Sequence, residues 1–339
     1  MSKKNKQERR IKIIQLKALK NKRRFRDYSK NRNKFHRRRL GKKKRERPPN
    51  SEIFKLDTQT IKIPATFSIS NDIEAVLSVI YKTKKLIEIK RFRQFDFDLS
   101  KVTIIDDSAA TILLSLCFDI NNENKKVRVR WPDDANARKY IDQMGFRRFF
   151  QGYVPNRDGL NETLKKGRST ILQRETVPII HKAMRTISGS DKKNQNLQGM
   201  LIELMTNSVN HAFLNNTREK TWYISTRHDI QNKKVEFCFV DNGDGIINTI
   251  HVRIGKRLLM SDEDILIKAF NGEFRSRTLE KNRGRGLVVI KKNSKKMTVS
   301  KLKVITNNVL LDFETGQATK LGTPFSGTFY SWILDQTCK

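Results

Sequence analysis

The chain has 339 residues, of which 37% are hydrophobic and 31% are charged, and its formal net charge is +36. The length is enough for about two domains, and the longest apolar run, residues 109–118, is too short for a membrane span, which needs about 20 residues. The three cysteines form no CxxC pair and no hydrophobic signal core is present, so we expect a cytoplasmic protein without structural zinc and without a membrane partner.

Residues 1–50 form a strongly basic segment. They contain 23 of the 71 Lys and Arg residues and three acidic residues, so this segment alone carries a formal charge of +20. Such a segment cannot bury enough apolar surface to fold alone, and we predict a disordered arm. Because a dense Arg-rich arm neutralises phosphates, we predict that it binds RNA or DNA rather than acting only as a solubilising tail. The predicted contacts are Arg23, Arg24, Arg26, Arg37, Arg38, Arg39, Lys42, Lys43 and Lys44.

The next segment, residues 51–155, alternates strand-like and helix-like stretches. Strands are predicted at 60–69, 95–105 and 126–131, and helices at 72–84, 108–120 and 133–150. This alternation predicts a small α/β domain. Within it, the run Thr-Ile-Ile-Asp-Asp-Ser-Ala-Ala at 103–110 leads from an apolar strand through Asp and Ser into an apolar helix.

The order of these elements and the turn at 103–110 resemble the STAS domain of anti-sigma-factor antagonists. In that family the turn often reads Asp-Ser-Ser-Gly, and its second Ser accepts a phosphoryl group. Ser108 takes that place here, with Ala109 in place of the Gly. The resemblance implies a protein partner and a candidate phosphoacceptor at Ser108, whereas the interpretation we favour is that Asp107 or Ser108 simply caps the helix.

Residues 156–175 are polar, contain two glycines and predict a linker. The segment that follows predicts a second folded domain, which begins with helices at 176–186 and 196–213. An antiparallel strand pair is predicted at 221–227 and 234–240, a charged and mobile stretch at 255–281, a helix at 288–293, and strands at 297–306, 309–313 and 327–334.

Two residues of the second helix carry candidate chemistry. Glu203 and Asn207 are four residues apart and therefore share one helix face. A carboxylate in that position can orient or deprotonate a water or hydroxyl nucleophile. An amide oxygen beside it can take one ligand position on Mg²⁺, which prefers oxygen ligands.

Two glycine-rich loops follow. Asp241 ends a predicted strand in the sequence Asp-Asn-Gly-Asp-Gly, where the carboxylate can accept from an adenine amino group while the glycines let the ring approach the backbone. Gly284 and Gly286 stand at the start of a predicted helix, where free N–H groups and the positive end of the helix dipole favour phosphates. The prediction of a nucleotide site depends on the order of these elements, which is helix pair, strand, loop, charged stretch, loop and helix.

Because its elements and motifs come in this order, the segment 177–334 resembles the GHKL superfamily of ATP-binding domains. These domains have the Bergerat fold, and the superfamily includes gyrase, histidine kinases and MutL. Residues 203–212, Glu-Leu-Met-Thr-Asn-Ser-Val-Asn-His-Ala, resemble the N-box, most closely that of the anti-sigma-factor serine kinases. Residues 241–245 and 282–287 resemble the two glycine boxes, and 327–329 resembles the late Gly-Thr. No phosphoacceptor-histidine hairpin precedes the domain, which argues against an orthodox sensor histidine kinase.

The resemblance implies ATP and Mg²⁺ as cofactors. Glu203 would act as the base, Asn207 would hold the metal, and Asp241 would read adenine with Thr328 beside it. The remaining residues implied to bind the cofactor are Gly243, Gly245, Ile246, Asn282, Gly284, Arg285, Gly286 and Leu287.

We therefore predict an α+β protein with a disordered arm at 1–50, a STAS-like α/β domain at 51–155, a linker at 156–175 and a Bergerat α/β sandwich at 176–339, in which a mixed sheet packs on helices. The predicted function is an ATPase: Mg-dependent ATP binding with slow hydrolysis, acting as a regulatory switch coupled to nucleic-acid binding and to ATP-dependent homodimerisation. One alternative is a serine protein kinase of the anti-sigma type that acts on a STAS-domain Ser such as Ser108. Another is a nucleic-acid-binding protein whose ATP site is purely conformational, in a stress, toxin–antitoxin or defence module.

Overall fold

The structure is a computed structural model of the chain, in which the predicted STAS-like segment and the predicted ATP-binding segment belong to one compact unit, Lys55–Lys339. The predicted basic arm lies outside the residues that the structure describes. No helix in the described part of the chain is both long and apolar enough to cross a bilayer. The described residues are 57–144, 146, 165–168, 173–210, 212, 221–254, 260–274 and 286–338.

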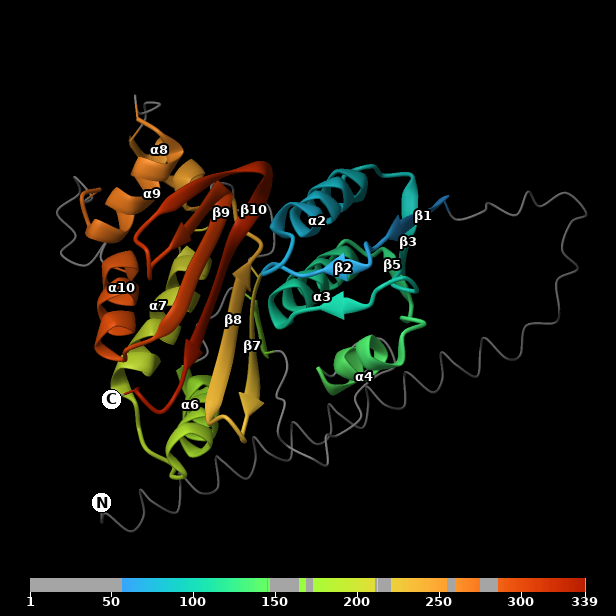
Figure 1. The fold of residues 1–339 in the computed structure, drawn as a ribbon. Helices are drawn as coiled ribbons and strands as arrows, with labels where there is room; N and C mark the ends of the chain where they lie inside the picture. Colours follow the sequence, from blue (N-terminus) through green and yellow to red (C-terminus); the bar gives the residue numbers. More distant parts are fainter. Residues whose placement is uncertain are drawn as a thin grey trace, which may run out of the picture. The chain divides into compact units, whose positions relative to one another are not determined.

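The amino-terminal lobe, defined here as residues 57–146, is built on a parallel sheet of three strands in the order β1-β3-β5 (Figure 1). These strands are β1 (Asp57–Lys62), β3 (Phe92–Asp98) and β5 (Lys126–Arg130), and a two-residue pair joins β2 (Thr66–Phe67) to β4 (Ile104–Ile105). The helices between them are α2 (Ile73–Ile87) and α3 (Asp107–Asn122), and α4 (Ala135–Gln143) follows β5. The predicted alternation of strands and helices is confirmed, although α4 ends earlier than the predicted helix at 133–150.

Helix α3 is apolar along its whole length because it is buried on nearly every side. Ile112, Leu113 and Leu114 are each at most 1% exposed, although consecutive residues point in different directions around a helix. The hydrophobic core around α3 includes Tyr223 and Val240, which lie on strands of the carboxyl-terminal sheet. A helix that is hydrophobic all round is a buried helix, and here it lies inside a core that the two predicted domains share.

The start of α3 differs from the prediction by one residue. Its N-cap is Asp106, not Asp107 or Ser108, since Asp106 Oδ1 accepts from the backbone N–H of Ala109 at 2.7 Å. The second oxygen of Asp106 accepts from Ser68 Oγ at 2.7 Å and from the N–H of Ser70 at 3.0 Å. The cap therefore also holds the turn that follows β2, a tertiary requirement that helix spacing alone does not show.

The carboxyl-terminal sheet has five strands in the order β6-β7-β8-β10-β9. They are β6 (Lys165–Arg168), β7 (Thr221–Asp229), β8 (Lys234–Asp241), β9 (Ser300–Asp312) and β10 (Ala318–Leu334). All four pairings are antiparallel, so the α+β class is confirmed whereas the mixed sheet that we predicted is antiparallel throughout these described strands. The two strands predicted at 297–306 and 309–313 form the single strand β9.

Strand β6 lies inside the segment predicted to be a linker. Its sequence is Lys-Lys-Gly-Arg, which has no apolar alternation to indicate a strand. It pairs antiparallel with β7, and the indole of Trp222 packs so closely on Gly167 that an added Cβ would lie 2.0 Å from the ring. The strand is thus defined by its neighbour and not by its own side chains, and the sheet begins before the predicted domain boundary.

Alternation along the strands gives this sheet two different apolar faces. Trp222, Phe237 and Phe239 belong to a core shared with helices, whereas Tyr223 and Cys238 belong to the core of the amino-terminal lobe. The helical layer, seen beside β9 and β10 in Figure 1, holds α6 (Gln173–Ser188), α7 (Gln195–Asn210), α8 (Ile246–Ile254), α9 (Asp262–Asn271) and α10 (Gly286–Lys296).

The stretch at 255–281, predicted to be mobile, contains helix α9. Ser261 caps this helix by accepting from the N–H of Asp264 at 3.1 Å, and Gly272 ends it with a left-handed φ of 81°. Ile265 and Phe270 are buried against the sheet. The acidic first turn concealed this apolar face in the sequence, and the remaining residues of the stretch, 255–259 and 275–281, lie outside the described part.

Candidate functional site

A pocket of about 140 Å³ lies between the helical layer and the carboxyl-terminal sheet. Its walls come from α7, the end of β8, α8, α9, the start of α10 and β10. Eight of the predicted site residues line it: Glu203, Asn207, Asp241, Gly245, Ile246, Gly286, Leu287 and Thr328. The fold thus brings together four segments that are far apart in the sequence, while the predicted residues Asn282, Gly284 and Arg285 lie outside the described residues.

Asp241 forms one end of the pocket and is 4% exposed. Its Oδ1 accepts from the N–H of Gly243 at 2.9 Å and from the N–H of Thr328 at 3.1 Å, and Ser208 Oγ lies 3.3 Å from Oδ2. Burial raises the pKa of this carboxyl group to about 6, against the opposing effect of those hydrogen bonds. The positive charge of Lys84 also lowers this pKa.

Gly327 brings β10 close enough to Asp241 for the Thr328 contact. Its φ of +113° is one that only glycine adopts readily, and a Cβ there would lie 2.2 Å from the carbonyl oxygen of Asp241. The backbone conformation of Gly327 therefore places the N–H of Thr328 within hydrogen-bond distance of the Asp241 carboxylate.

The loop after Asp241 is held by two neighbouring residues of β9. Thr306 Oγ1 accepts from the N–H of Ile246 at 2.9 Å and donates to the carbonyl oxygen of Gly327 at 3.2 Å. Asn307 accepts from the N–H of Ile247 at 3.1 Å and donates to the carbonyl oxygen of Asp244 at 3.0 Å. These hydrogen bonds fix the backbone of the loop at the Asp241 end of the pocket.

Glu203 and Asn207 form the other end of the pocket, with Gly286 directly opposite. A Cβ on Gly286 would lie 2.7 Å from Asn207 Oδ1 and 2.8 Å from Glu203 Oε2. Both side chains therefore point from α7 to the first residue of α10, and the first N–H groups of a helix have no partner within the helix. Burial raises the pKa of Glu203, as expected for a group poised to accept a proton.

The donor set at this end fits Mg²⁺ held jointly with a phosphate ligand. It offers an amide oxygen and a carboxylate, and among the described residues Asn207 Nδ2 has no hydrogen-bond partner that would turn the amide away. The described part of the chain has no cluster of three or more His, Cys, Asp or Glu side chains that could hold a metal alone. An amide oxygen and a carboxylate suit Mg²⁺, which takes few protein ligands and completes its shell with water and phosphate oxygens.

The sequence analysis did not identify the apolar wall of the pocket. This wall consists of Thr249, Ile250, Ala269, Phe274 and Tyr330. Tyr330 lies two residues after Thr328 on the same strand face, so period-two spacing was a usable signal. The contributions of Ala269 and Phe274 depend on α9, whose capping residues Ser261 and Gly272 were the missed signal.

Ser108 lies away from this pocket. Its Oγ is 3.6 Å from the Sγ of Cys238 on β8, a residue of the core shared with the amino-terminal lobe. Asp241 is three residues later on β8 and its side chain is on the opposite face of the sheet, where it lines the pocket. The sheet therefore separates Ser108 from the pocket.

No protein-family model matches the sequence, and no curated protein matches it either. Among solved structures, the histidine kinase domain of the Erythrobacter litoralis EL346 blue-light activated histidine kinase aligns with 59% of this chain and 74% of its own, at 13% identity and a TM-score of 0.26. Because a score this low reflects only loose overlap, the functional interpretation depends on the geometry of the pocket.

Proposed function

We propose that the chain binds Mg·ATP in this pocket and hydrolyses it slowly, as a nucleotide-dependent switch of the GHKL type. The observation that carries the proposal is the convergence of Glu203, Asn207, Asp241, Gly286 and Thr328 on one cavity. One end of the pocket has a carboxylate beside glycine residues, which suits the adenine of a nucleotide. The other end has two side-chain oxygens that face the start of a helix, which suits the phosphates.

The roles follow from the contacts at each end. Asp241 would accept from the adenine amino group, because its hydrogen bonds from Gly243 and Thr328 keep the carboxylate oriented. Asn207 would hold Mg²⁺, which neutralises phosphate charge when it is bound. Glu203, with its raised pKa, would orient and deprotonate the attacking water.

Serine kinase activity toward Ser108 of the same chain is less well supported. With Mg²⁺ and γ-labelled ATP we expect free labelled phosphate and no labelled protein, because the sheet lies between Ser108 and the pocket. The measurement counts both products for the wild type and for Ser108→Ala. Label on the protein that disappears in Ser108→Ala would establish the kinase instead, and ATP binding without either product would leave a purely conformational ATP site.

We further propose that the basic arm binds nucleic acid, supported by its charge of +20. Removing residues 1–50 should lower the affinity for RNA or DNA and reduce the salt dependence, since each phosphate contact contributes about 0.9 to the slope of log affinity against log salt for duplex DNA. Titrations at several salt concentrations measure both quantities, with ATP affinity as the control that should not change. An unchanged affinity and slope would contradict the role of the arm.

A further inference from the structure

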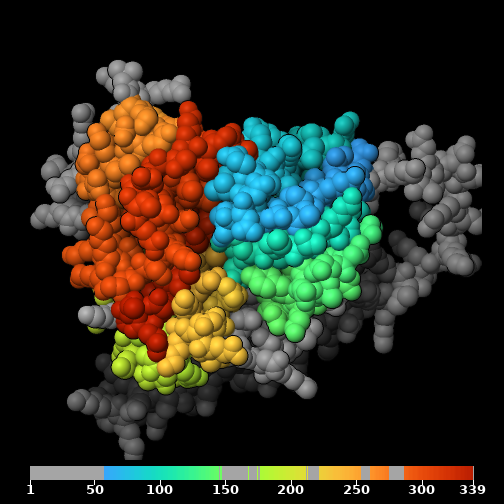
Figure 2. Space-filling view, in the orientation of Figure 1, coloured from blue at the N-terminus to red at the C-terminus, as the bar shows by residue number. Residues whose placement is uncertain are grey.

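Helix α2 of the amino-terminal lobe contacts the strand that carries Thr328. Lys84 Nζ donates to the carbonyl oxygen of Ser326 at 2.7 Å and lies 5.5 Å from the centre of the Phe325 ring. At the other end of the helix, Glu74 Oε1 accepts from the N–H of Gly322 at 2.7 Å. The space-filling view shows the surface of α2 directly against β10 (Figure 2).

The segment that α2 holds is an irregular part of β10. The pairing of β10 with β9 shifts register between Lys320 and Phe325 and again between Phe325 and Thr328. Such bulges lack the regular ladder that fixes a strand. Contacts from outside the sheet therefore help to fix the position of residues 322–326. Glu74 contacts Gly322 at the start of this segment, and Lys84 contacts Ser326, the residue before Gly327.

Helix α3 of the same lobe contacts the residue that follows Asp241. Asp119 Oδ1 accepts from Asn242 Nδ2 at 3.3 Å, next to Asp241 in the sequence. The same oxygen accepts from Thr221 Oγ1 at 3.3 Å and from the hydroxyl of Tyr223 at 3.2 Å. Asp241 and Thr328 are paired across β8 and β10, so the lobe contacts both strands within two residues of this pair.

We propose that the amino-terminal lobe is a regulatory clamp on the proposed adenine end of the nucleotide pocket, with Lys84 as its positioning residue. This inference rests on the proposed function, because the clamp acts through the pair that would read adenine. Lys84 fixes the carbonyl group of Ser326, this fixes Gly327, and Gly327 presents the Thr328 N–H to Asp241. Since coupling between two sites is reciprocal, ATP binding must strengthen the contact of α2 with β10 as much as that contact strengthens ATP binding.

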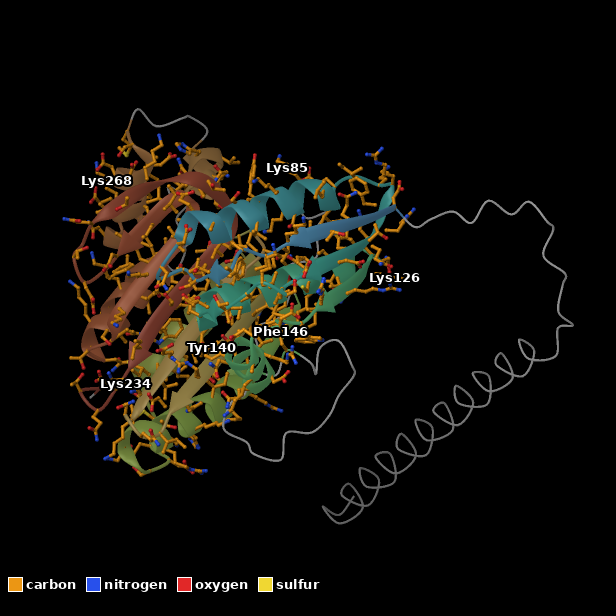
Figure 3. All side chains as sticks on the ribbon, turned by 45° about the vertical axis from the view of Figure 1, so that its right-hand side comes forward. Lys85, Lys126, Tyr140, Phe146, Lys234 and Lys268 are labelled. Atoms are coloured by element: carbon orange, nitrogen blue, oxygen red, sulfur yellow. The ribbon has the colours of Figure 1, made fainter. Side chains whose placement is uncertain are left out.

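The test compares Lys84→Met with Lys85→Met. Lys85, labelled in Figure 3, is the next residue on α2, is exposed, and lies 5.6 Å from the ring of Tyr81 on the same helix. Lys84→Met should weaken ATP and ADP binding equally, by about 3- to 10-fold, the size expected for one charge-assisted hydrogen bond that acts indirectly. Lys85→Met should bind both nucleotides like the wild type, and Lys84→Arg should restore most of the affinity.

Equal losses of affinity for ATP and ADP locate the effect at the adenine end of the pocket, because a defect at the phosphate end would change the ratio of the two affinities. Amide exchange gives a second measure: saturating ATP should slow exchange in α2 of the wild type and of Lys85→Met, but not of Lys84→Met. If the wild type binds ATP and Lys84→Met binds it like Lys85→Met, the clamp is wrong and the proposed function stands. If the wild type binds no adenine nucleotide, both fail.

Discussion

Asn207→Ala should weaken Mg·ATP binding by at least about 100-fold while leaving the protein folded. The substitution removes the amide oxygen that faces Gly286, at the end of the pocket proposed to take the phosphates. Stability should change little, because Asn207 Nδ2 makes no hydrogen bond within the described part of the chain and the residue is only half-buried. Calorimetric titration measures binding, and thermal unfolding measures the fold.

The metal dependence separates this role from simple packing. In EDTA the wild type and Asn207→Ala should bind ATP with the same weak affinity, because the difference between them lies in Mg²⁺. Asn210→Ala is the matched control, since Asn210 is the exposed last residue of the same helix. Tight Mg·ATP binding by Asn207→Ala would show that the site is assigned wrongly, and equal losses with and without Mg²⁺ would remove the metal role.

The parts of the site that could be predicted from the sequence are those set by local geometry. Glu203 and Asn207 share a helix face because they are four residues apart. Asp241 and Gly245 share a turn at the end of one strand, and Gly286 begins a helix. Their convergence on one cavity was implied only by the resemblance of their order to a known superfamily, and the pocket now supplies it as geometry.

The parts that could not be predicted depend on long-range contacts. Lys84 and Ser326 are 242 residues apart, and Asp119 and Asn242 are 123 apart. On its own, Lys84 is one of many lysines in a basic chain. Strand β6 likewise exists because Trp222 packs over it, and the shared core around α3 could not be distinguished from two separate cores by the apolar pattern alone.

The role proposed for Asp241 sets function against stability in this pocket. A carboxylate with raised pKa costs stability whenever it is ionised, yet only the ionised form accepts a hydrogen bond with both oxygens. With a pKa of about 6 it is ionised at neutral pH. The cost corresponds to roughly 2 to 3 kcal/mol at neutral pH, which the protein tolerates because the surrounding N–H groups are already oriented.

Asp241→Asn should therefore stabilise the protein at pH 8 by about 1 to 3 kcal/mol and abolish ATP binding. The amide oxygen can keep the hydrogen bonds from Gly243 and Thr328, and the amide nitrogen can donate to Ser208 Oγ. The same nitrogen would face the adenine amino group with a donor in place of an acceptor. Urea unfolding and calorimetric titration measure the two effects.

The pH dependence has a definite sign. Below about pH 4 the carboxyl group is protonated in both the folded and the unfolded states, so wild type and variant should differ little. Between about pH 4 and pH 6 the unfolded state ionises first, because burial raises the folded pKa to about 6, and the wild type loses stability as pH rises. The advantage of Asp241→Asn should therefore grow across that window and stay constant above it. Asp244→Asn, in the same loop, is the control variant and should still bind ATP. A pH-independent change in stability, or ATP binding by Asp241→Asn equal to that of the wild type, would show that Asp241 is not the buried adenine acceptor.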